Sequence, residues 1–173
     1  MLSTTVVFGL FATAMASAIP ASLSARIPDG VTYTVIAPED IPDYIKGTGS
    51  ATEIAARDGL AKRADYGVYL CTNAGWQGHC VHIVAPSGVC VPLADDLNDK
   101  VSSVGPDAGA YCRFNLLVLP CLVFIFFDYG CPSNSCDHFD LTAPGYTDLS
   151  QVAKVCGINP PNDKVSSYQC WAA

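Results

Sequence analysis

Asn98-Asp99-Lys100-Val101-Ser102-Ser103 recurs without change as Asn162-Asp163-Lys164-Val165-Ser166-Ser167. An identical hexapeptide in a small protein indicates an internal duplication, so the chain is expected to contain two similar units. Four of the six repeated residues carry a side-chain oxygen, which is the kind of ligand that a hard cation such as Ca²⁺ prefers. The repeat therefore predicts both an architecture and a chemistry.

The beginning of the chain predicts export from the cell. An apolar run, Val6–Ala14, is followed by the small residues Ala16-Ser17-Ala18, so residues 1–18 are interpreted as a signal peptide. The run is too short to span a bilayer, and the rest of the sequence contains no stretch of the length that a transmembrane helix needs.

Residues 19–63 differ in composition from the rest of the chain, because they contain no cysteine and no tryptophan. They end in Lys62-Arg63, a dibasic pair of the kind that processing proteases of the secretory pathway cut. The interpretation is a pro-segment. The alternative is an ordered N-terminal part of the mature domain, and Thr32–Ile36 has the composition of a strand.

All nine cysteines fall in residues 64–173, which are predicted to form a single domain. This cysteine content in a short secreted chain is typical of a disulfide scaffold, although the pairing cannot be read from the sequence. Nine is an odd number. One thiol is therefore free, joined to another chain, or part of a stretch that does not belong to the protein.

The predicted mature domain is acidic. Residues 64–173 contain four Lys or Arg against ten Asp, with no Glu. Phosphate backbones would repel such a surface, so a nucleic-acid partner is excluded and cations are the natural partners. The simpler reading is that acidity only keeps a secreted monomer soluble.

Short β-rich runs separated by turn-forming residues predict an all-β sandwich or barrel. The runs in the first unit are Val68–Cys71, Cys80–Val84 and Val89–Val91. Unit one is placed at residues 66–107 and unit two at 108–173. Each hexapeptide lies near the end of its unit, with one more strand after it.

An apolar run, Leu116–Phe127, makes the second unit longer than the first. It does not alternate between apolar and polar residues, as a half-exposed strand would. It could be a buried strand, a hairpin that enters the core, or translated non-coding sequence. The run contains Cys121, whose removal would leave an even number of cysteines.

The hexapeptide fits the pattern Asn/Asp-Asn/Asp-x-x-Ser/Thr-Ser, which resembles the calcium-binding signature of the βγ-crystallins. Trp76 and Gly78 match the family's aromatic-x4-aromatic-x-Gly hairpin, with Cys71 where an aromatic is usual. The resemblance covers Tyr66–Trp171 and implies a disulfide-stapled β-sandwich of two Greek keys, with one signature in each key. The cysteine content and pro-segment resemble those of small secreted fungal members.

The resemblance also implies two weak Ca²⁺ sites, each shared between the keys. In each signature the fifth-position Ser would give its hydroxyl, the third-position Lys its backbone carbonyl, and the second-position Asp would shape or charge the loop. The implied site residues are Asp99, Lys100, Ser102, Asp163, Lys164 and Ser166. A further carbonyl would come from the first hairpin of the partner key, near Thr72 and Asn73 for the second signature.

Two features of the hexapeptide oppose ion binding. A lysine ammonium near a cation costs electrostatic energy unless it extends into solvent. Asn-Asp and Ser-Ser are also turn formers whose side chains bond nearby backbone groups, so loop geometry alone could account for the repeat.

Other chemistries have weaker support in the sequence. Cys131, Cys136 and His138 are close in the chain but lack paired zinc-ligand spacing. His79 and His82 are accompanied by no nucleophile motif, so they are interpreted as strand or surface residues and the protein as a non-enzyme.

The function predicted from the sequence is a secreted, calcium-binding, structural or stress-type βγ-crystallin-like module. One alternative is a secreted antimicrobial toxin or host-interacting effector. Another is an inhibitor of a secreted protease. An extracellular protein or a cell surface is a further candidate partner for these alternatives.

Overall fold

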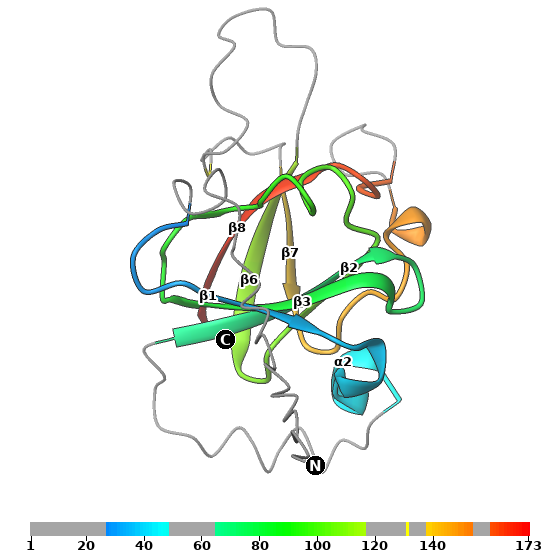
Figure 1. The fold of residues 1–173 in the computed structure, drawn as a ribbon. Coiled ribbons are helices and arrows are strands. Elements are labelled where there is room, and N and C mark those ends of the chain that lie inside the picture. Colours follow the sequence, from blue (N-terminus) through cyan, green and yellow to red (C-terminus); the bar gives the residue numbers. More distant parts are fainter. Residues whose placement is uncertain (1–26, 49–64, 117–130, 132–137, 154–159) are drawn as a thin grey trace, which may run out of the picture.

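The computed structural model describes residues 27–48, 65–116, 131, 138–153 and 160–173 (Figure 1). Its elements are β1 (Thr32–Ile36), η1 (Pro38–Asp40), α2 (Asp43–Lys46), β2 (Asp65–Asn73), β3 (Gln77–Pro86), β4 (Val91–Pro92), β5 (Ser103–Pro106), β6 (Ala110–Leu116), β7 (His138–Thr142), η2 (Leu149–Gln151) and β8 (Val165–Ala172). Strands predominate and the helices are short. No helix in these ranges is long and apolar enough to cross a membrane.

Two four-stranded antiparallel sheets make up the fold, with strand orders β1-β3-β2-β5 and β4-β8-β6-β7. In Figure 1, β1, β2 and β3 run across the view, whereas β6, β7 and β8 run more nearly up it. The sheets pack face to face because their strands bury alternate side chains. The core between them includes Val68, Leu70 and Ile83 from the first sheet, and Phe114 and Tyr168 from the second.

Each unit pairs with the sheet of the other, through a strand in one direction and a single bridge in the other. Strands β2, β3 and β5 of the first unit form most of the first sheet, but β4 pairs instead with β8 of the second unit. In the reverse direction, Tyr146 of the second unit pairs with Val104 of β5. Two intertwined Greek keys have this arrangement, so the predicted all-β, two-key fold class is confirmed.

The described residues form three disulfides, and two of them join neighbouring strands. Cys71–Cys80 links β2 to β3 and Cys112–Cys170 links β6 to β8, whereas Cys90–Cys131 joins two residues outside the strands that are 41 positions apart. The prediction of a disulfide-stapled fold is confirmed, and disulfides are typical of proteins from oxidising compartments. Cys121, Cys136 and Cys156, together with most of the apolar run (117–127), lie outside the described residues.

The first described segment, residues 27–48, packs against the domain. Thr32–Ile36 forms a strand, as its composition suggested, and pairs antiparallel with β3. Tyr44 and Ile45 of α2 are buried. The sequence did not predict α2, because four residues are too few to show helical periodicity.

Tyr168 carries a hydroxyl into the centre of the core, where it donates a hydrogen bond to the carbonyl of Ile83 (3.2 Å). Burial, with a smaller effect of the Asp107 charge, raises the pKa of the Tyr168 phenol far above its ordinary value. The folded state therefore keeps the phenol protonated at pH values where the unfolded chain releases the proton. Stability from this group is complete below the unfolded pKa of about 10 and is lost as pH rises above it.

We therefore expect alkaline destabilisation that depends on Tyr168. Above pH ~10 this group should lower the free energy of unfolding by up to about 1.4 kcal/mol per pH unit. Urea unfolding between pH 8 and pH 11 should show a shallower decline in the Tyr168→Phe variant than in the wild type. Tyr146→Phe, at a side chain that is 39% exposed, is the matched control. Equal slopes for wild type and Tyr168→Phe would contradict the prediction.

Candidate metal centre

The two hexapeptides form bends of the same backbone shape. One immediately precedes and enters β5, and the other does the same at β8. Their second residues, Asp99 and Asp163, have φ angles of 56° and 55°. Few residues other than glycine adopt this left-handed conformation, and Asp and Asn are among those that do so most often. The repeated Asn-Asp pair therefore suits the bend.

The bends lie side by side and exchange backbone hydrogen bonds. The Asp99 N–H donates to the Val165 carbonyl, and the Asp163 N–H donates to the Val101 carbonyl. The N–O distance is 3.1 Å in both hydrogen bonds. These four residues occupy matching positions in the two repeats. The bends are therefore related by the pseudo-twofold symmetry of the two keys.

Side chains cross between the bends in the same reciprocal way. The Ser102 hydroxyl donates to Asp163 Oδ1 (3.2 Å), and the Ser166 hydroxyl donates to Asp99 Oδ1 (3.3 Å). Both serines are buried. The sequence grouped each serine with the aspartate of its own signature. The structure instead joins the serine of one signature to the aspartate of the other, which gives two equivalent Ser–Asp clusters.

The sequence analysis overlooked the first residue of each repeat. Asn98 Nδ2 donates to Asp99 Oδ2 (3.2 Å), and Asn162 Nδ2 donates to Asp163 Oδ2 (2.8 Å). Each amide thus holds the second carboxylate oxygen, while a serine from the other unit holds the first. The signal was present in the sequence, because the amide is identical in both repeats.

The two lysines differ in their surroundings. Lys100 is exposed, and its ammonium donates to the backbone carbonyl of Asp95 (2.7 Å). Lys164 is half-buried. Because the Lys100 ammonium lies at the surface with a carbonyl acceptor, solvent weakens its repulsion of a nearby cation.

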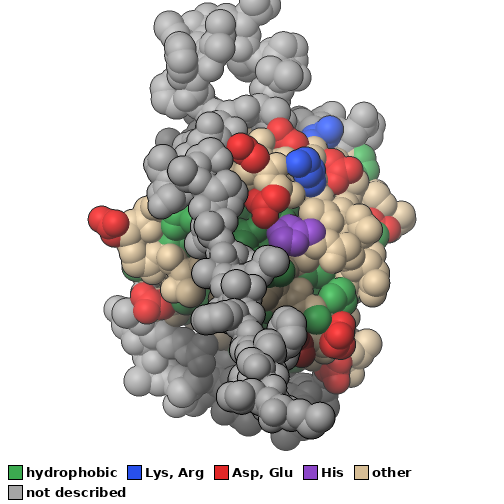
Figure 2. All heavy atoms as spheres, viewed as in Figure 1, with side chains coloured by type: hydrophobic (Ala, Val, Ile, Leu, Met, Phe, Trp, Pro, Cys, Tyr) green, Lys and Arg blue, Asp and Glu red, His purple; other side chains and the backbone are tan. Residues whose placement is uncertain are grey.

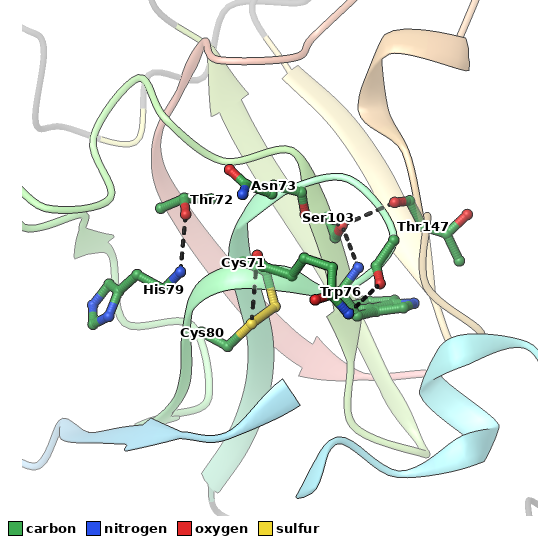
Figure 3. The surroundings of a disulfide bond; sticks show 10 residues. Cys71, Thr72, Asn73, Trp76, His79, Cys80, Ser103 and Thr147 are labelled. Carbon is green, nitrogen blue, oxygen red and sulfur yellow. Dashed lines mark hydrogen bonds between the residues drawn. A yellow bond between two sulfur atoms is a disulfide. The ribbon is translucent and has the colours of Figure 1, made fainter. Parts of the chain in front are cut away.

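The first hairpin adjoins the Ser102–Asp163 cluster through the neighbouring residues Ser102 and Ser103. Figure 3 shows Ser103 between Asn73 of the hairpin and Thr147. The Ser102 N–H donates to the Cys71 carbonyl (2.9 Å). The Ser103 hydroxyl lies 2.8 Å from the Asn73 carbonyl and 2.9 Å from that of Thr147. Backbone oxygens of the hairpin are therefore close to this cluster, although the Asn73 carbonyl is already paired with Ser103.

The oxygen atoms of the two clusters have spacings that suit Ca²⁺. Ca²⁺ binds oxygens at 2.3–2.6 Å, so neighbouring ligands of one ion lie roughly 3–3.5 Å apart. The Ser–Asp separations of 3.2 and 3.3 Å fall within this range. In addition, the buried Asn98 Oδ1 has no hydrogen-bond partner among the described residues. The donor set of hydroxyl, carboxylate and carbonyl oxygens fits a hard cation.

Acidic groups outnumber basic groups on one face of the molecule. Figure 2 shows several acidic side chains and few basic ones on the face in view, in line with the formal net charge of −7. Weak long-range attraction of cations follows from this charge balance.

The zinc alternative loses one of its candidate thiolates, because Cys131 is in a disulfide with Cys90. No three His, Cys, Asp or Glu side chains come together in a metal-holding group within the described ranges. Each Ser–Asp cluster contains one carboxylate, so it is a site of a different kind.

Comparison with known proteins gives slight structural likenesses. No protein-family model and no curated protein matches the chain. One similar solved structure comes from work on the evolution of the eye-lens βγ-crystallin domain fold. It is 20% identical, has a TM-score of 0.43, and the match covers 66% of this chain and 93% of that one. Another is a βγ-crystallin from an archaeon, 23% identical with a TM-score of 0.38, over 60% of this chain and 95% of that one.

Proposed function

We propose that this protein is a secreted, non-enzymatic, βγ-crystallin-like module that binds two Ca²⁺ ions weakly at the paired bends. The proposal is carried by one observation, the reciprocal contact of Ser102 with Asp163 and of Ser166 with Asp99. Each site would take a hydroxyl from one unit and a carboxylate from the other. Bound ions would then link the two keys, which supports a structural role.

With one carboxylate in each site, affinity should be in the range of about 10⁻⁴ to 10⁻³ M that is typical of extracellular modules. At 1 mM Ca²⁺, a site with a Kd of about 10⁻⁴ M would stabilise the folded protein by about 1.4 kcal/mol. The disulfides supply a larger part of the stability, so Ca²⁺ would reinforce a fold that already exists.

Isothermal titration and thermal unfolding with Ca²⁺ test this proposal. In wild-type protein we expect two weak binding events and a rise of roughly 1.4 kcal/mol per site in the free energy of unfolding at 1 mM Ca²⁺. Asp163→Asn and Asp99→Asn should each remove one site, because each substitution removes the only carboxylate of its cluster. Asp65→Asn, at an exposed carboxylate that begins β2, is the control and should leave both sites intact.

The Asn substitutions also separate ion binding from loop geometry. Asn tolerates the left-handed conformation and can accept the same serine hydrogen bond, so it preserves the bend. If the repeat serves loop geometry alone, wild type and Asn variants will have equal stability with and without Ca²⁺. No heat of binding and no shift in Tm at millimolar Ca²⁺ would remove the proposal.

The toxin and protease-inhibitor alternatives remain hypotheses from the sequence. Neither the contacts of the described residues nor the comparisons favour them. The predicted signal peptide and the Lys62-Arg63 pair lie outside the described residues, and secretion with processing after Arg63 is part of the proposal.

A further inference from the structure

The segment formed by residues 27–48 covers an edge of the first sheet. Its strand β1 pairs antiparallel with β3 at every residue from Thr32 to Ile36. In the order β1-β3-β2-β5, β3 would be the edge strand if β1 were absent. An uncovered edge presents unpaired N–H and C=O groups and is a template for another strand.

The same segment places apolar side chains in a second, smaller core. Ile41, Tyr44 and Ile45 are 2%, 4% and 0% exposed, and they cluster with Trp76 and the Cys71–Cys80 disulfide. This combination of a paired strand and buried apolar anchors is the way in which extended peptides bind to sheet edges. A segment that served only as a covalent linker would require neither the paired strand nor the buried side chains.

Close backbone contacts show that the domain surface is shaped for this occupant. The Gly145 N–H donates to the Ile45 carbonyl (3.1 Å). A Cβ atom on Gly105 would lie only 2.6 Å from Ile45 Cγ2, so glycine is required there for the isoleucine to seat. Figure 1 shows α2 beside the hairpin end of β2 and β3.

A polar contact also joins β1 to the domain. The Tyr33 hydroxyl donates to Asp96 Oδ2 (2.7 Å), and His79 Nε2 lies 2.9 Å from the same oxygen. Tyr33 belongs to β1, whereas Asp96 and His79 belong to the domain. The phenol therefore completes a cluster that the domain holds ready on its surface.

We propose that the domain of residues 65–173 retains residues 27–48 as a non-covalently bound chain after the chain that connects them is cut. The strand-acceptor surface that binds this segment consists of the outer edge of β3, Trp76, the Cys71–Cys80 disulfide and Gly105. The only adjacent pair of basic residues in the sequence, Lys62-Arg63, lies in that connection. The processed protein is then a two-chain complex. The ligand class of this surface is an extended peptide strand followed by apolar anchors.

Cleavage of the full-length protein tests the proposal without isolating either part. The intact protein is treated with an endoprotease specific for dibasic pairs, and cleavage is verified by mass spectrometry under denaturing conditions. Size-exclusion chromatography in native buffer should then give one peak that contains both chains. Separate elution of the N-terminal fragment from a domain that is still folded by circular dichroism would overturn the proposal.

Paired variants within the segment identify the contacts that hold it. Ile45→Ala removes a fully buried anchor and should weaken retention at least about ten-fold, measured by the fraction of fragment lost on dilution. Val35→Ala, in the same segment at a side chain that is 63% exposed, should retain the fragment as the wild type does. Equal losses in the two variants would overturn the assignment of the anchor.

A competition experiment covers the case in which Ile45→Ala does not fold. The cleaved wild-type protein is depleted of its fragment in mild denaturant, returned to native buffer, and mixed with a labelled synthetic peptide of residues 27–48. Uptake of this peptide, with at least about ten-fold weaker uptake of the same peptide carrying Ile45→Ala, is the expected result. No uptake, or a domain that instead dimerises, would show that residues 27–48 are not the occupant.

Discussion

Replacement of Phe114 by alanine should lower the free energy of unfolding by about 3–5 kcal/mol. Phe114 is fully buried on β6, where its ring stacks on Phe139 (centroids 5.1 Å apart) and lies 6.0 Å from the ring of Tyr168. Truncation removes the transfer free energy of the ring and leaves a cavity between the sheets that the strands cannot collapse to fill. Urea unfolding monitored by circular dichroism measures the loss.

Arg113→Ala is the matched control, because Arg113 precedes Phe114 in the same strand and faces the other way. It forms an ion pair with Asp140 on the adjacent strand β7, with Nε 2.9 Å from Oδ1. A surface ion pair of this kind contributes about 0.2–1 kcal/mol. If Phe114→Ala cost no more than Arg113→Ala, the interior between the two sheets would not be the main source of stability.

Removal of the Cys112–Cys170 disulfide should cost about 4 kcal/mol, and removal of Cys71–Cys80 about 2.5 kcal/mol. The two bridges close loops of different length, with sequence separations of 58 and 9. In the chain-entropy model a longer closed loop restricts the unfolded chain more. Double Cys→Ala variants at each pair, unfolded by urea under the same conditions, measure both values.

The order of the two losses is the test of this prediction. Each disulfide joins two neighbouring strands within its own sheet, and all four cysteines are buried. The two variants therefore create similar vacancies in the packing. The difference therefore reports mainly on the unfolded state. A larger loss at Cys71–Cys80 would mean that contacts of the hairpin with Trp76 and residues 27–48 outweigh chain entropy.

The repeated hexapeptide made part of the fold predictable. It indicated two similar units, and the left-handed Asp99 and Asp163 do occupy equivalent bends before the last strand of each unit. The sequence could not show that Ser102 meets Asp163 rather than its own neighbour Asp99, because that contact depends on how the two units face each other. Long-range pairing is decided by the packing of the sheets and leaves no local pattern.

The docking of residues 27–48 could not be predicted from the sequence for a related reason. Thr32–Ile36 has the composition of a strand, but nothing local indicates that its partner is the outer edge of β3. The three anchors, Ile41, Tyr44 and Ile45, are too few and too close in sequence to show a period. The disulfide pairing was equally inaccessible, since it follows from which strands become neighbours.

The exchange of β4 and Tyr146 between the sheets has a consequence for how such a protein could have arisen. A single ancestral key would have lacked a strand that its own sheet needs. Two identical molecules would have completed each other's sheets by exchanging strands in a dimer. Fusion of two copies in tandem makes the borrowed strand part of the same polypeptide, so completion no longer depends on protein concentration. Each half could afterwards diverge, as the unequal lengths of sequence between β2 and β3 (74–76) and between β6 and β7 (117–137) show.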